Sequence, residues 1–220
     1  MMLKIKADQK PWNHKRVYRI YGELGLNIRI KPRKRLPAGE AKTLLQPIFS
    51  NHSWSLDFMS DALDDGRRFR TFNVIDDYNR EALMIEPSFT LPAQRVTRLL
   101  AQLAHLRGYP SYIRIDHGPE FESGQFKAWA KEHHIILDYI QPGKPAQNGF
   151  IERFNRTYRE EVLGMNLFND LAEVKRITQA WIKQYNYERP HESLAGLAPI
   201  VFAKKRQSNL MYQGENSTFN

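Results

Sequence analysis

The sequence contains no cysteine, and no run of apolar residues approaches the length of a membrane-spanning helix. The first absence excludes disulfide bonds, thiolate zinc sites and a cysteine nucleophile. The second argues against a helical membrane anchor, which takes ~20 apolar residues. The basic N-terminus also lacks the apolar segment of a secretory signal. Together these absences favour a protein of the reducing cytoplasm.

Acidic residues are scarce in one place only. Residues 1–35 hold eleven Lys and Arg against Asp8 and Glu23, which accounts for the whole net charge of +9. The 22 basic and 22 acidic residues that follow cancel. A local excess of positive charge favours a polyanionic partner such as nucleic acid.

The basic segment has the pattern of a short helix over residues 12–26, closed by Gly25 and followed by a linker rich in Pro and Arg. Such a helix buries little and is marginal alone. We expect this segment to contact DNA, and the alternative is a solvated charged helix. The DNA contacts expected here are Lys15, Arg16, Arg19, Arg33, Lys34 and Arg35.

From residue 53 onward the apolar pattern predicts an α/β protein. Alternating segments separated by short turns predict a three-stranded antiparallel meander, and the later segments alternate between helix and strand. The order β-β-β-α-β-α-β-α is typical of a mixed sheet covered by helices. The expected strands are residues 53–62, 69–76, 82–89, 111–116 and 135–140, and the expected helices are 91–107, 122–134, 150–163 and a last one from Asp170.

Three acidic residues occupy positions where sites form. Asp57 lies inside the first strand, Asp116 ends the fourth strand, and Glu152 begins a helix after a loop rich in Gly and Pro. Sites in α/β sheets gather beyond the carboxyl ends of parallel strands. Each acid alone has an ordinary explanation, as a cap for Asp116 or as a solvated i, i+4 pair of Glu152 with Arg156.

The helix that begins near Gly149 separates two kinds of residue. A helical wheel predicts a buried face and an opposite, exposed stripe that joins one carboxylate to an amide and two guanidiniums. Such a stripe suits metal binding at the carboxylate and phosphate contact by the arginines. The buried face is Phe150, Ile151, Phe154, Tyr158 and Val162, and the stripe is Glu152, Asn155, Arg156 and Arg159.

These segments carry a resemblance to a known superfamily. "WSLDFM" with Asp57, "IRIDHGPEF" with Asp116 and "NGFIERFNR" with Glu152 look like the catalytic segments of DDE transposases and retroviral integrases. The 35 residues between Asp116 and Glu152 match the spacing of that superfamily, and Arg159 matches its basic residue seven positions beyond the glutamate. More narrowly, residues 12–203 resemble the integrase-like second reading frame of the insertion-sequence-three (IS-three) family of bacterial transposases.

The resemblance implies a ribonuclease H-like fold with a mixed five-stranded sheet flanked by helices. It implies an integrase catalytic core over residues 50–165 and a C-terminal helical extension over residues 166–203. Residues 1–38 would be the remnant of a helix-turn-helix segment, and we expect residues 204–220 to form a disordered tail.

The resemblance also implies a reaction, which is cleavage of DNA by water followed by joining through a DNA 3′-OH. Asp57, Asp116 and Glu152 would be catalytic and would bind two Mg²⁺ or Mn²⁺ ions, with Asp57 bridging them. Hard cations prefer oxygen ligands, and two ions serve both ends of an in-line displacement. The implied partners are double-stranded DNA (transposon ends and target), further copies of the chain and an upstream reading frame, with no membrane. The implied setting is the bacterial nucleoid.

Two features depart from the family pattern. His117 stands where these proteins commonly have Asn, so we expect His117 and Gly118 to support the site, and the alternative for His117 is a simple turn residue. The N-terminal segment is shorter than the family's helix-turn-helix, which indicates a truncated product. A catalytically silent DNA-binding remnant of a mobile element and a ribonuclease H-like nuclease are therefore the alternative functions.

The remaining candidates have simpler explanations. The loop "QPGKPAQNG" is expected to close over DNA, with Lys144 and Gln147 as contacts. Turn chemistry explains Asp64-Asp65 and Asp76-Asp77. A zinc site at His133-His134 lacks further ligands, and Arg189-Pro190-His191 is expected to end a helix and pack on the core.

Overall fold

We describe the chain from a computed structural model. The structure describes residue 8 and residues 12–26, 46–141 and 145–216. Lys144 and the expected DNA contacts Arg33, Lys34 and Arg35 lie outside the described residues. Within the described part, no helix is long and apolar enough to cross a bilayer.

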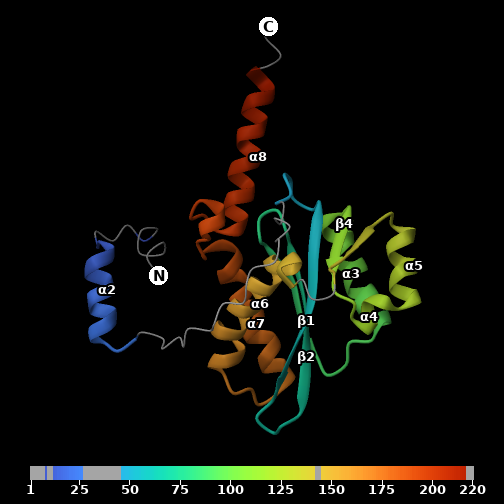
Figure 1. Cartoon of the computed structure of the whole chain (residues 1–220), viewed down its shortest axis with the longest axis horizontal. Coiled ribbons are helices and arrows are strands. Elements are labelled where there is room, and N and C mark those ends of the chain that lie inside the picture. Colours follow the sequence, from blue (N-terminus) through green and yellow to red (C-terminus); the bar gives the residue numbers. More distant parts are fainter. Residues whose placement is uncertain (1–7, 9–11, 27–45, 142–144, 217–220) are drawn as a thin grey trace.

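A mixed five-stranded sheet forms the centre of the fold (Figure 1). Its strand order is β3-β2-β1-β4-β5, with β1–β2–β3 antiparallel and β1–β4–β5 parallel. The expected meander is confirmed, and Gly66 adopts a positive φ in its first turn, where a side chain would be strained. The strands are β1 (Ser53–Ala62), β2 (Arg68–Asp76), β3 (Ala82–Ser88), β4 (Tyr112–Ile115) and β5 (Ile136–Tyr139).

Helices cover both faces of the sheet (Figure 1). The helix expected over residues 122–134 is two helices, because the hydroxyl of Ser123 accepts the N–H of Phe126 and starts α5 there. The helices are α2 (His14–Glu23), α3 (Ala93–Arg107), α4 (Pro119–Glu122), α5 (Gly124–Glu132), α6 (Gly149–Glu161), α7 (Leu171–Tyr187) and α8 (Pro199–Asn216), with short 3₁₀ turns at Pro145–Asn148, Leu163–Met165 and Glu192–Leu194.

The sheet has an apolar core on each face. On one face α3 and α5 pack over Trp54 and Phe72, both fully buried. On the other face α6 and α7 pack over β2 and β3, with Tyr158 and Trp181 in contact. Of the predicted apolar face of α6, Ile151, Phe154, Tyr158 and Val162 are buried, and Phe150 is half-buried. The second of these cores holds α6 against the sheet.

The basic N-terminal helix is present as α2. The side chain of Asn13 accepts the N–H of Arg16 at its start, and Gly25 follows its end with a positive φ. None of its residues is buried. Lys15, Arg16 and Arg19 are exposed, and Arg19 pairs with Glu23 one turn on.

The expected boundary at residue 203 falls inside a helix. α8 runs without a break from Pro199 to Asn216, across residues that were expected to form a disordered tail. The extension over residues 166–203 is built into the core, since Phe168, Val174 and Trp181 belong to the apolar cluster under α6.

The turn after β2 also departs from its prediction. Asp64 and Asp65, in the turn after β1, are exposed as turn residues usually are. Asp76 and Asp77 are fully buried. Asp76 does make the expected turn bond to the N–H of Tyr78, yet both aspartates also bond to distant segments of the chain. Turn chemistry alone therefore does not explain them.

Candidate active site

The parallel pairing of β1 with β4 positions the first two acids. Ser53 pairs with Tyr112 and Ser55 with Arg114. Continued by two residues, this register puts Asp116 beside Asp57, one strand spacing away, ~4.8 Å in a sheet. As the sequence predicted, Asp116 lies at the end of the fourth strand and Asp57 lies inside the first, which continues to Ala62.

The third acid comes from α6, the helix that packs on the sheet beside α7. Glu152 lies in the first turn of α6 and is half-buried. Burial raises the pKa of its carboxyl group, and the nearby Arg156 opposes the shift. The charges of Asp116 and Glu152 both act on Asp57, so a strand, a strand end and a helix bring the three acids near one another.

The cluster is electrostatically strained around Asp57. Burial, together with the negative charges of Asp116 and Glu152, raises the pKa of Asp57 to about 6. The bonds that it accepts from the N–H of Phe58, at 2.7 Å, and from Asn155 oppose this shift. Like charges held together in a half-buried place disfavour ionisation. A cation at this position relieves that repulsion.

The structure corrects the predicted position of Asn155. It does not share an exposed stripe with Arg156, because it is only 8% exposed and lies where α6 crosses the sheet. Its Nδ2 donates to Oδ2 of Asp57 at 2.7 Å, and its Oδ1 accepts from Nδ2 of Asn73 at 2.7 Å. Both ends of the amide are engaged inside the protein, so Asn155 is a positioning residue for Asp57 and not a DNA contact in this structure.

Asn73 is a residue that the sequence reasoning missed. It is fully buried on β2 and pairs directly across the sheet with Asp57. The available signal was the hairpin register, because counting outward from the turn at Asp64–Gly66 brings the two residues opposite one another. The two hydrogen bonds that link Asn73 to Asn155 and Asn155 to Asp57 hold the carboxylate of Asp57 in one orientation.

Gly118 and His117 follow Asp116 in different roles. The N–H of Gly118 donates to Oδ1 of Asp116 at 3.0 Å, and a Cβ atom at this glycine would meet that same oxygen at 3.0 Å. His117 is exposed, stacks on the ring of Tyr139 and shares a 2.7 Å hydrogen bond with Glu122. Gly118 therefore shapes the pocket of Asp116, whereas His117 packs beside it.

The expected DNA contacts on and near α6 are spread along one side. Arg156 is exposed, and Arg159 is exposed with its guanidinium on the carbonyl of Ser60 and near Asp61. Gln147 accepts the N–H of Gln141 at 2.8 Å. Arg156 and Arg159 keep free surface toward solvent, as a phosphate contact requires.

The donor set fits a divalent cation, although the three acids are not preassembled around one. Within the described residues, no group of three His, Asp or Glu side chains stands close enough to hold a metal ion. The candidates Asp57, Asp116 and Glu152 are oxygen donors with excess negative charge, which is the chemistry that Mg²⁺ and Mn²⁺ prefer. The zinc alternative gains no support, since His133 stacks on Tyr109 at 4.1 Å.

Sequence comparisons connect the chain to mobile elements. Residues 50–145 match a family described as integrase core domain, and residues 133–199 match a second family of the same description. The insertion element IS407 uncharacterized 31.7 kDa protein of Burkholderia multivorans is 41% identical over 196 residues, covering 89% of this chain and 71% of that protein.

Two further relatives match a similar share of this chain but differ in their own lengths. The insertion element IS476 uncharacterized 39.2 kDa protein of Xanthomonas euvesicatoria is 41% identical over 191 residues, covering 87% of this chain and 55% of that protein. The chain thus spans about half the length of this relative. The uncharacterized transposase-like protein of Haemophilus influenzae is 26% identical over 200 residues, covering 86% of this chain and 92% of that protein.

Solved structures identify the fold. The HTLV-2 integrase catalytic core domain in complex with magnesium (trimeric form) has a TM-score of 0.54 at 15% identity, covering 71% of this chain and 98% of that one. The catalytic core domain of BIV integrase has a TM-score of 0.52 at 16% identity, covering 73% and 99%. At these identities the likeness shows the fold alone, which is ribonuclease H-like, as predicted.

Proposed function

Because the chain belongs to the integrase core family of insertion-element proteins, we propose that it cleaves DNA strands and joins them to new sites by a DDE mechanism. The substrates are the ends of a mobile element and a target duplex. The first nucleophile is water and the second is a DNA 3′-OH.

The observation that supports this function is that Asp116 and Glu152, from two other elements, lie near enough to Asp57 for their charges to act on it. Burial and these two negative charges raise the pKa of Asp57 to about 6. A fold that keeps such repulsion at the carboxyl ends of parallel strands gains from a bound cation. Perturbed carboxyl groups of this kind cluster at functional sites.

Asp57, Asp116 and Glu152 would hold Mg²⁺ or Mn²⁺, in a two-ion site. When bound, such ions activate the attacking oxygen and stabilise the departing 3′ oxygen. The chain's own residues position the reaction. Asn155 and Gly118 orient Asp57 and Asp116 through the bonds described above, while Arg156 and Arg159 on the same side of α6 hold the phosphate backbone.

Strand transfer by the purified chain tests this function. A labelled duplex carrying the terminal sequence of the encoding element is incubated with a plasmid, in Mg²⁺, in Mn²⁺ or in EDTA. We expect joined products with either metal ion and none in EDTA. The assay is run with and without the product of an upstream reading frame, because the relatives reach greater lengths.

The same assay separates the alternatives. A ribonuclease H-like nuclease yields cut products but no joined ones, and a DNA-binding remnant retards the duplex on a gel without cutting it. Absence of both cutting and joining under every condition contradicts the proposed function. We also propose that several copies of the chain assemble on the DNA, which sedimentation of the duplex complex measures.

Changing Asn155 tests the positioning of Asp57. We expect Asn155→Leu to lower the strand-transfer rate by about 10- to 100-fold, the usual cost of removing a group that orients a metal ligand. Duplex affinity should stay unchanged, because Asn155 is buried and does not reach DNA. Asn155→Gln is the matched variant. It keeps the amide group, but its longer side chain moves the donor away from the carboxylate of Asp57. A Leu variant with the wild-type rate refutes the positioning role.

A further inference from the structure

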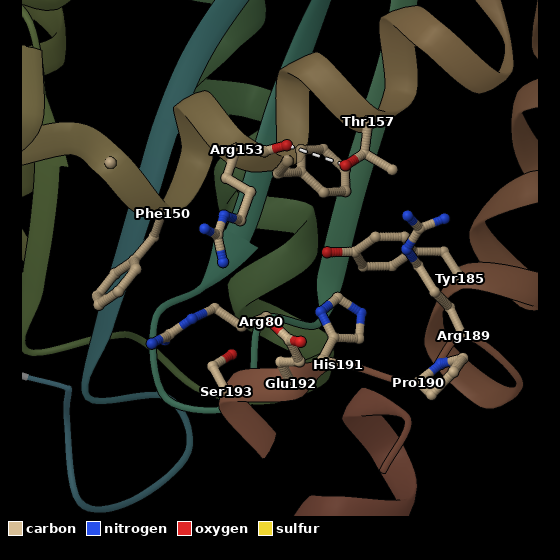
Figure 2. A pocket seen from close by; sticks show the side chains of 12 residues that line it. Arg80, Phe150, Arg153, Thr157, Tyr185, Arg189, Pro190, His191, Glu192 and Ser193 are labelled. Carbon is tan, nitrogen blue, oxygen red and sulfur yellow. Dashed lines mark hydrogen bonds between the residues drawn. The ribbon is translucent and has the colours of Figure 1, made fainter. Parts of the chain in front are cut away.

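A pocket of about 540 Å³ lies beside α6, and none of the three clustered acids lines it (Figure 2). Its walls come from the turn after β2, the first turns of α6, the end of α7 and the 3₁₀ turn that follows. Three arginines face one acid, Glu192, among the residues that line it. The lining residues are Arg80, Gly149, Phe150, Arg153, Phe154, Thr157, Tyr185, Arg189, Pro190, His191, Glu192 and Ser193.

Arg80 lines this pocket, and one of its two terminal nitrogens has no hydrogen-bond partner among the described residues. The residue is 8% exposed, and its Nη1 is buried with no bonding partner among the described residues. Its guanidinium lies 3.5 Å from the ring centre of Phe150, which fixes its direction. A buried guanidinium keeps its charge, and because Arg80 lines the pocket this charge favours an anion there.

Asp77, the acid whose charge acts most strongly on Arg80, already accepts hydrogen bonds from other residues. Asp77 accepts from the hydroxyls of Ser53 and Ser55 at 3.0 and 2.6 Å, and from Arg114 at 3.0 Å. No hydrogen bond joins it to Arg80 among the described residues. The positive charge at the pocket floor is therefore only partly offset.

Arg153 adds a second guanidinium that extends into the pocket above Arg80 (Figure 2). It is exposed, and the described residues offer it no ion pair. Arg189 differs, because its guanidinium pairs with Glu161. The positive charges of all three arginines, with burial as the larger cause, lower the pKa of His191 to about 4. The charged residues that line the pocket are thus three arginines and one glutamate, an excess of positive charge.

The first turn of α6 also opens on this pocket through Gly149 and Phe150. Asn148 precedes the helix but provides no side-chain cap. The leading N–H groups of a helix attract anions when no cap satisfies them. Two guanidiniums above a helix N-terminus match a tetrahedral oxyanion, whose several oxygens accept from separate donors.

We propose that this pocket is a phosphate site, in which Arg80 and Arg153 hold the oxygens of a phosphate group. The source we favour is a backbone phosphate of the DNA, because Arg153 is exposed and directly follows Glu152 on α6. Only this choice of source rests on the proposed function. Free phosphate has the same chemistry and is the other source.

The test compares the Asp57→Asn protein with two variants of it that also carry Arg153→Gln or Arg176→Gln, all kept in EDTA so that no turnover occurs. Arg176 is an exposed arginine of α7 outside the pocket, so its variant controls for the lost charge. One arm measures duplex binding by fluorescence anisotropy at several salt concentrations. The other measures the melting temperature with sodium phosphate at constant ionic strength.

For a DNA phosphate we expect Arg153→Gln to weaken duplex binding by about 3- to 10-fold and to lower the salt slope by about one. Arg176→Gln should leave both unchanged. If phosphate raises the melting temperature of all but Arg153→Gln while duplex binding is equal, the site stands and its source is free phosphate. Equal behaviour of the two Gln variants in both arms overturns the proposal. Since binding is read without catalysis, a failed strand-transfer assay leaves this result intact.

Discussion

Replacing Asp57 with Asn is expected to abolish strand cleavage and joining, with a loss of about 10³-fold or more. The carboxylates hold the metal ions that supply several kcal/mol of stabilisation to the reacting phosphate, and each 1.4 kcal/mol changes the rate about tenfold. Asp116→Asn and Glu152→Gln should have the same effect. Duplex affinity should change by about twofold at most, because the arginines provide the phosphate contacts.

Two measurements show whether the loss of activity instead reflects a loss of folding. Asp57→Asn should be at least as stable as wild type at pH 7, since it removes a charge that burial and two like charges disfavour. Added Mg²⁺ should raise the melting temperature of wild type but not of this variant. Asp61→Asn, on the same strand but beside Arg159, is the matched acid and should keep activity. Full activity in any one of the three site variants refutes the assignment of that residue.

Asp77→Ala is expected to cost about 3 kcal/mol of the free energy of unfolding. Asp77 is fully buried and accepts from Ser53, Ser55 and Arg114. Removing one partner of a buried pair leaves the other charge uncompensated, which costs about 3–5 kcal/mol. We take the lower end because Arg114 keeps a second bond, to Asp138 at 3.0 Å. Denaturant titration monitored by tryptophan fluorescence measures the loss.

The matched control lies in the other hairpin. Asp64 occupies the equivalent place in the turn after β1 but is exposed, so Asp64→Ala should leave the unfolding midpoint within error of wild type. Asp77→Asn keeps an acceptor for the two serines and should lose less than Asp77→Ala. If Asp77→Ala and Asp64→Ala unfold at the same denaturant concentration, Asp77 is an ordinary turn residue after all.

The same turn gives the stability a pH dependence through Asp76. Burial raises its pKa from 3.8 to about 6, so between these values the folded state binds more protons than the unfolded state. The free energy of unfolding therefore falls as pH rises from about 4 to about 6, and this contribution levels off above that window. Asp76→Asn should flatten this part of the stability profile, which thermal unfolding across the pH range measures.

Most of the fold was predictable because local patterns determine it. Alternation of apolar residues located every strand, and the Gly66 turn and the stop at Gly108 and Pro110 separated the elements. The segments with Asp57, Asp116 and Glu152 were also visible in the sequence, since their spacing survives without coordinates. The unbroken α8 was missed because its outer residues show no apolar stripe that would predict helix.

By itself the sequence determined which residue types sit on which element, and hence the family, the fold and the three acids. Only the tertiary structure decided their neighbours. Two turns with the same Asp-Asp pair proved opposite, because Asp76 bonds to Asn51 and Asp77 bonds to residues of β1 and β4, far along the chain. For the same reason Asn155 is buried and does not belong to the predicted exposed stripe. Arg80 and Arg153, far apart in the sequence, line one pocket. Burial and charge depend on contacts between distant segments, and spacing along a single chain does not record them.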